Sequence, residues 1–138
     1  MTQFYFLSIL LNALSGGLLL SSAPGGYETA PDSPLLPPFL AKETPQLVLG
    51  GLTVLCGIFK LLSVFPGDLP VLGDFFPSVA GLAAGFMLVF RFYRKRGTLE
   101  DEKTERFSAL AEKNRKFIGI AALASSALHF LFPGVLFL

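Results

Sequence analysis

The sequence predicts an all-α integral membrane protein, folded as a bundle of four transmembrane helices. Three observations support this prediction. The chain is 52% hydrophobic and only 15% charged over 138 residues. A soluble domain of this size keeps a large exposed fraction, so it could not hide that much apolar surface. Nine of the eleven Lys and Arg residues lie in one stretch, residues 91–116. The apolar residues gather in four segments, at 4–20, 46–65, 74–90 and 117–138.

Each apolar segment has the length of a membrane span, since a transmembrane helix needs about 20 mostly apolar residues. Lipid contains no water to satisfy exposed backbone groups, so a spanning segment must be a helix or part of a closed barrel. The segments are too long and too continuously apolar for the alternating strands of a barrel. Little chain remains for a soluble domain, and residues 1–138 are predicted to form a single transmembrane domain.

The segment 4–20 is predicted to be retained and not cleaved as a signal peptide. It lacks the usual positive residues before its apolar run. Ser21, Ser22 and Ala23 would make a passable cleavage site, but Pro24 follows directly. The next stretch, 21–45, is predicted to be a proline-rich connector.

The basic stretch 91–116 predicts the orientation of the chain. It carries nine basic against five acidic residues, and loops with excess Lys and Arg stay cytoplasmic. Parity then places both termini outside, most simply across a plasma (inner) membrane. The connector 21–45 has more acidic than basic residues and resembles an outside loop. Acidic residues weigh little in this rule, so the orientation stands.

The basic stretch is predicted to contain the start of one long helix, at about residues 99–132. Gly97 is a plausible helix stop, and Thr98 offers an N-cap with Asp101 three residues later. The first half of this helix would extend the last membrane helix into the cytoplasm. Phe107, Leu110 and Ala111 form a narrow apolar stripe there, which would pack on the bundle or lipid, or dock a partner.

The chain also suggests an internal repeat of two parallel helical hairpins. At an offset of 69–70 residues, the first apolar segment aligns with the third and the second with the fourth. The match includes Gly50 with Gly119 and Lys60 with His129. Phe-Pro-Gly follows near the end of both the second and the fourth segments, at 65–67 and 132–134.

Ionisable residues within a membrane are costly and are the first candidates for function. Five polar residues form the candidate ligand or ion site: Lys60, Asp68, Asp74, His129 and Asn12. The predicted threading puts the four ionisable ones near the outer face. Structural roles are open for each, since Lys60 can extend to the interface and the aspartates can be solvated.

Small residues predict where helices approach closely. Gly81 and Gly85 form a GxxxG pattern, and Ala121 and Ser125 belong to a small face on the last segment. These faces would pack within the bundle or form a seam between copies. The lone Cys56 is expected to be a core residue.

No catalytic, cofactor or metal-binding motif is recognisable in the sequence, so an enzyme is not the favoured class. A net charge of +1 gives no global field for nucleic acid. The expected partners are the lipid bilayer, other membrane protein subunits, or further copies of the chain. The predicted function is a non-enzymatic subunit or assembly partner of a membrane complex. The alternative is a small oligomeric channel or transporter using the outer polar site.

Overall fold

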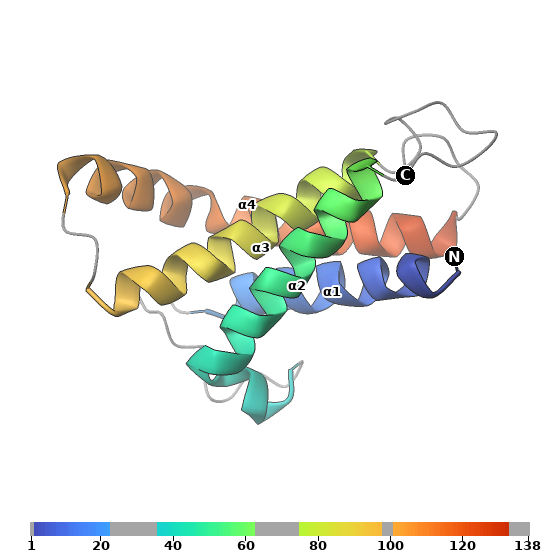
Figure 1. Cartoon of the computed structure of the whole chain (residues 1–138), viewed down its shortest axis with the longest axis horizontal. Helices are drawn as coiled ribbons and strands as arrows, with labels where there is room; N and C mark the ends of the chain where they lie inside the picture. Colours follow the sequence, from blue (N-terminus) through green and yellow to red (C-terminus); the bar gives the residue numbers. More distant parts are fainter. Residues whose placement is uncertain (1, 23–35, 63–74, 98–100, 133–138) are drawn as a thin grey trace.

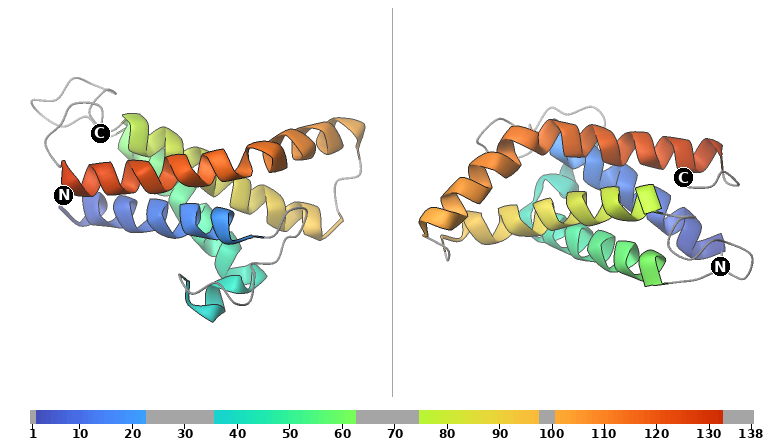
Figure 2. Two further views of the ribbon diagram at one scale, coloured as in Figure 1. Left: turned by 180° about the vertical axis from the view of Figure 1, so that it is seen from behind. Right: turned by 90° about the horizontal axis from the view of Figure 1, so that it is seen from above.

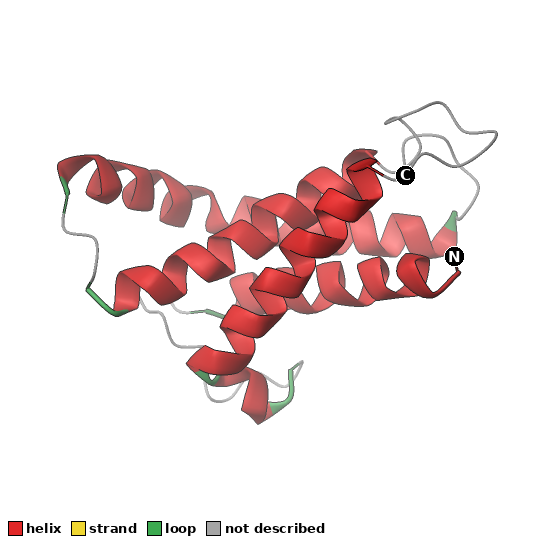
Figure 3. Cartoon of the chain, in the orientation of Figure 1, coloured by secondary structure: helices red, strands yellow, loops and turns green. Residues whose placement is uncertain are grey.

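The computed structural model describes residues 2–22, 36–62, 75–97 and 101–132, and this part of the chain is helical, without β-strands. Figures 1 and 3 show the arrangement. The elements, in order, are α1 (Thr2–Ser21), a short 3-10 turn η1 (Pro38–Ala41), α2 (Glu43–Leu62), α3 (Phe75–Lys95) and α4 (Glu102–Leu131). The predicted all-α class is therefore confirmed.

Several helix boundaries differ from those predicted. Helix α2 begins at Glu43, three residues before the predicted segment, because Pro45 is tolerated within a first helical turn. Helix α3 continues to Lys95, into the stretch predicted as the basic loop. Helix α4 begins at Glu102 after Asp101, which makes no side-chain capping bond. The predicted cap, Thr98, lies outside the described residues.

Three described helices are long and apolar enough to cross a membrane: Gln3–Ser21, Glu43–Leu62 and Phe75–Lys95. Helix α4 does not reach this standard within the described residues. Its first half is rich in charge, and the predicted fourth span, 117–138, is described only as far as Phe132. The fourth span thus stays a prediction.

Helices α1 and α3 run in one direction, and α2 and α4 run in the other (Figure 1). The closest pairs are α2 with α3 and α1 with α4. The start of α1 and the end of α4 therefore lie at the same end of the bundle, which we call the Lys60 end. The opposite end holds the end of α1 and the start of α2, and we call it the Arg91 end.

Glycines set the close approach in both pairs. A Cβ atom on Gly16 of α1 would lie 2.7 Å from the carbonyl oxygen of Gly119 in α4. A Cβ atom on Gly50 of α2 would lie 2.9 Å from the carbonyl oxygen of Gly85 in α3. Larger residues would push the backbones apart, so these contacts fix how the helices cross.

The core lies between the four helices, and large apolar side chains also cover much of the outside. The inner cluster contains Leu11, Leu18, Leu19, Leu40, Leu49, Cys56, Ala84, Met87, Leu88 and Ala122. The first part of α4 departs from the direction of the rest of the helix (Figure 2). It still touches α3, because the ring of Phe107 packs edge-on against that of Phe90, with centroids 5.1 Å apart.

Candidate functional site

A partly buried polar cluster occupies the Lys60 end. The Lys60 ammonium lies 2.9 Å from Nε2 of His129 and donates a hydrogen bond to the Ser8 hydroxyl at 3.1 Å. The Tyr5 hydroxyl donates to the backbone carbonyl of His129. The Lys60 Nζ also lies 5.9 Å from the centroid of the Tyr5 ring, within the range of a cation–π contact.

Three helices bring these side chains together. Lys60 stands in the last turn of α2 and His129 in the last turn of α4, while Tyr5 and Ser8 occupy the first turns of α1. The His129 side chain is almost fully buried, at 2% exposure. Apolar side chains elsewhere on these turns are exposed, so the polar groups are gathered on the inner faces.

The tautomer of His129 decides which group donates in its contact with Lys60. An ammonium group has only donors, so a protonated Lys60 pairs with an Nε2 that acts as an acceptor. In that tautomer the imidazole carries its proton on Nδ1.

The predicted site residues divide into three groups. The structure brings Lys60 and His129 together. Asn12 lies further along α1, where its amide donates a hydrogen bond to the carbonyl of Pro77 at 2.9 Å. Asp68 and Asp74 lie outside the described residues.

Sequence reasoning missed Tyr5 and Ser8. The available signal was the spacing of Ser8, Asn12 and Ser15, which places three polar residues on one face of α1. All three are buried. The Ser15 hydroxyl bonds that of Thr53 in α2 at 2.8 Å, so the face continues toward the middle of the bundle.

A second polar cluster occupies the Arg91 end and was not foreseen. Arg91 and Arg115 are 3% and 2% exposed. Arg91 donates to the Ser22 hydroxyl at 2.7 Å, and Arg115 donates to the Ser22 carbonyl. The carboxylate of Glu112 lies 3.4 Å from Nε of Arg91 and 3.6 Å from Nε of Arg115. Both arginines counted only as loop charges in the sequence, because nothing there showed that they turn inward.

A shallow open pocket adjoins this cluster, lined by Glu43, Gln46, Arg91, Phe92 and Lys95. Lys95 at the end of α3 forms an ion pair with Glu43 at the start of α2, with 2.7 Å between Nζ and the carboxylate. The pocket walls therefore combine both signs of charge, and Arg91 links the pocket to the buried cluster.

The predicted helix-packing residues lie at helix contacts of different kinds. Gly81 faces Asn12, and Gly85 faces Gly50. Ser125 is buried, whereas Ala121 is only partly covered. In the described part of the chain, no group of three His, Cys, Asp or Glu side chains is arranged to hold a metal ion.

Comparison with known proteins gives two matches. A protein-family model of unknown function matches residues 1–129. A protein of Treponema pallidum (strain Nichols), named "Uncharacterized protein", is 33% identical over 138 residues, which cover 100% of both chains. No solved structure matches the chain.

Proposed function

The chain belongs to this family of unknown function, and we propose that it is a membrane-inserted, non-enzymatic subunit or assembly partner of a membrane complex. The observation that carries the proposal is the contrast between a closely packed interior and an exposed, amphipathic first half of α4. The interior offers contacts between helices, whereas the α4 half offers a surface to another protein.

Membrane insertion is supported by the outer surface of the helices. Phe117 on α4 is 74% exposed and Phe76 on α3 is 62% exposed. Water would disfavour so many exposed apolar groups, whereas lipid would solvate them. Other exposed apolar side chains on the helices include Phe4, Phe6, Leu10, Leu52, Leu55, Phe59, Phe86 and Ile120.

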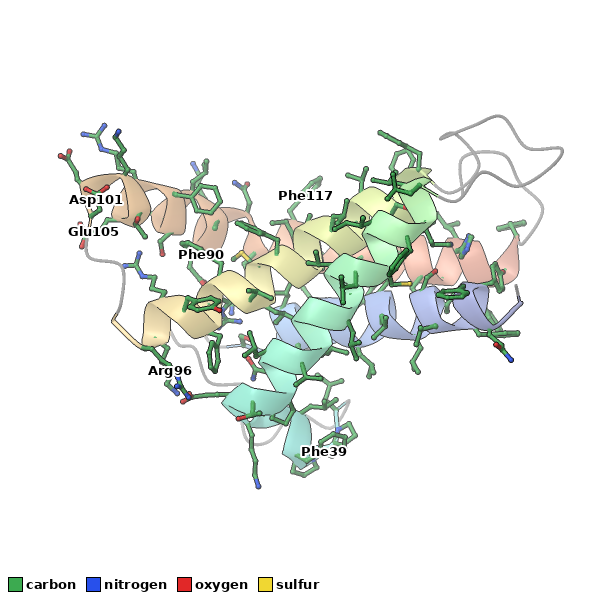
Figure 4. All side chains as sticks on the ribbon, viewed as in Figure 1. Phe39, Phe90, Arg96, Asp101, Glu105 and Phe117 are labelled. Atoms are coloured by element: carbon green, nitrogen blue, oxygen red, sulfur yellow. The ribbon has the colours of Figure 1, made fainter. Side chains whose placement is uncertain are left out.

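The orientation is supported by the separation of charge along the bundle. Asp101 and Glu105 lie at the far tip of α4, and Arg96 lies at the nearby end of α3 (Figure 4). The basic stretch 91–116 thus belongs to the Arg91 end, which we place in the cytoplasm. The Lys60 end then faces outward across a plasma membrane.

The two-hairpin repeat is supported by the burial pattern at an offset of 69. The buried positions on α1 and at the residue just after it are Ser8, Leu11, Asn12, Ser15, Gly16, Leu18, Leu19 and Ser22. Each has a buried equivalent 69 residues later, from Pro77 to Arg91. Helices α2 and α4 match at the same offset, for example at Gln46 and Arg115. An offset of 70 for α1 and α3, as the sequence match suggested, would misalign these faces.

Packing favours a subunit over a conduit. The backbone contacts at Gly16 and Gly50 leave little space between helices. Leu18, Leu19 and Leu88 are at most 1% exposed and fill the section between the two polar clusters. A substrate path usually needs polar groups through the membrane centre, and the buried Asn12, Ser15 and Thr53 there are hydrogen-bonded to the bundle itself.

The first half of α4 is the surface that we assign to a partner. Leu110 is 58% exposed and Phe107 is 45% exposed, although Phe107 also contacts α3. Charged residues surround them, and Arg106 pairs with Glu102 at 2.7 Å. An exposed apolar stripe between charges is typical of helices that dock in a groove.

Site-specific photo-crosslinking in native membranes tests this assignment. A photoreactive residue at Leu110 should yield one protein adduct of defined mass. The matched control is Leu52, an exposed apolar residue on α2, which should yield lipid adducts. Equal protein labelling at both sites, or none at Leu110, would contradict the proposal.

Cysteine labelling tests the orientation independently. With Cys56 replaced by serine, a cysteine at exposed Lys103 should resist membrane-impermeant reagents added to intact cells. It should react after the membrane is opened. Reaction in intact cells would reverse the topology.

One observation favours the second candidate, a small oligomeric channel or transporter. Lys60 and His129 do meet in one partly buried cluster. Purified protein in vesicles would then show ion or solute flux that His129→Ala lowers at least severalfold. Absence of flux from well-inserted protein would exclude this candidate.

A further inference from the structure

The hairpin of α1 and α2 packs closely against the hairpin of α3 and α4. Contacts between hairpins, α1 with α4 and α2 with α3, exceed those within each hairpin. At an offset of 69, Gly16 is equivalent to Gly85, and Gly50 is equivalent to Gly119. The contact between Gly16 and Gly119 is therefore equivalent to the contact between Gly85 and Gly50. Such an exchange is the property of a two-fold axis, here running along the helices.

Residues on a two-fold axis meet their own equivalents. Three pairs in the structure do so. Lys60 contacts His129 and Ser22 contacts Arg91, and both pairs are separated by 69 positions. The third pair is Asn12 and Gly81, where a Cβ atom on the glycine would lie 2.5 Å from the Asn12 side-chain oxygen. The first two pairs lie at opposite ends of the bundle and the third lies between them.

Identical residues could not fill any of these three positions well. Two lysines at the Lys60 position would place like charges at hydrogen-bond distance. Two arginines at the Arg91 position would do the same. Two asparagines at the Asn12 position would overlap, since the space taken by one side chain depends on the missing Cβ of Gly81.

The three pairs are therefore complementary because their members differ. Lys60 Nζ lies at hydrogen-bond distance from Nε2 of His129, and Arg91 donates to Ser22. Asn12 fills the space beside Gly81 and uses its amide to bind the Pro77 carbonyl. The next equivalent positions along α1 and α3, Ser15 and Ala84, do not need side chains of different size or charge. Both are small and fully buried.

We infer that these axis pairs form a pairing surface specific for the unlike hairpin. The inner face of the α1–α2 hairpin fits a hairpin that carries Gly81, Arg91 and His129, and disfavours a copy of itself. This inference rests on the repeat described under the proposed function, but not on the role as a subunit. The two halves of the chain therefore differ at these positions in a way that favours pairing with each other over pairing with a copy of themselves.

Reciprocal exchange in the full chain tests the inference. Gly81→Asn should lower the midpoint of thermal unfolding in detergent by about 5 °C or more, because two asparagines then collide. The exchange Asn12→Gly with Gly81→Asn should recover more than half of that loss. Recovery of half or less would overturn the equivalence of these positions.

The lysine–histidine pair gives a second exchange that does not depend on steric fit. His129→Lys should lower the midpoint, and adding Lys60→His should recover more than half of the loss. The matched control moves the lysine to a position 70 residues away, Lys60→Phe with Phe130→Lys. Phe130 is 59% exposed, so this control should remain destabilised.

Each result separates the pairing surface from the proposed subunit role. If both axis exchanges recover and the control does not, the pairing surface stands even when crosslinking at Leu110 fails. If neither axis exchange recovers, the pairing surface is wrong, and a defined crosslink at Leu110 would still support a subunit.

Discussion

The two ends of the bundle each hold positive charge, but they bury it to different depths. At the Arg91 end, two guanidinium groups share the carboxylate of Glu112. At the Lys60 end, the neighbours of the ammonium include Ser8, Tyr5 and His129. Lys60 is only partly buried, whereas Arg91 and Arg115 are 3% and 2% exposed. The difference teaches that the more deeply buried pair of adjacent cations depends most on its counter-charge, because a buried charge left unpaired is costly.

The Arg91 end should be the more fragile of the two when its counter-charge is removed. Glu112→Gln leaves two buried arginines facing each other, which should lower the free energy of unfolding by about 3 kcal/mol. Denaturant unfolding in detergent micelles would measure the loss. The control is Glu102→Gln, which breaks an exposed pair on the same helix and should change stability little. Equal effects of the two substitutions would show that Glu112 does not hold the arginines.

Between the ends, the two glycine contacts should respond alike. Gly50→Ala and Gly119→Ala both add a methyl group against a facing backbone oxygen, at 2.9 and 3.0 Å. Each should cost about 1–3 kcal/mol, since overpacking forces the helices to shift. Gly51→Ala is the control, because no atom lies within 4 Å of its added Cβ. Thermal unfolding of the three variants would reveal whether the middle of the bundle is symmetric while its ends differ.

The Lys60 end should tolerate loss of its charge better. Lys60→Met removes the contacts with Ser8 and His129, but the ammonium is only partly buried, so its loss should cost about as much as an ordinary hydrogen bond. The expected net loss is about 1 kcal/mol, less than for Glu112→Gln. The same denaturant experiment applies, with Lys42→Met at an exposed position as control. A loss as large as that of Glu112→Gln would mean that the two ends do not differ as described.

The smallest effect is expected where the second hairpin already dispenses with polar groups. Ser15 and Thr53 share a hydrogen bond, whereas their equivalents 69 residues later are Ala84 and Ala122, both 0% exposed. The double variant Ser15→Ala with Thr53→Val should lose less than about 1 kcal/mol, as is usual for such bonds between membrane helices. Thermal unfolding would check this. A loss greater than that of Lys60→Met would mean that the Ser15–Thr53 hydrogen bond contributes substantially to stability, which would contradict the prediction.

Part of the candidate site was predictable and part was not. Lys60 and His129 were found because ionisable residues are rare in apolar segments. The aligned positions of the two residues did not show that their side chains are in contact, and only the fold does. Arg91 and Arg115 were missed since a charged stretch in sequence carries no sign of which side chains turn inward. Gln46 and Ser22 gave still less signal, because their polarity is common at helix ends.

The sequence by itself determined the helical class, because long apolar runs in this chain leave only helices able to satisfy their backbone groups. It also suggested an internal repeat at an offset of 69–70 residues, since apolar residues and glycines recur at that spacing. The tertiary structure favours an offset of 69 for the proposed repeat, because burial distinguishes adjacent positions that apolar composition does not. It also decided which cations lie inside, since that depends on how helices distant in sequence meet. The reason is physical: composition sets what a segment can bury, but only contact between segments sets what each buried group must face.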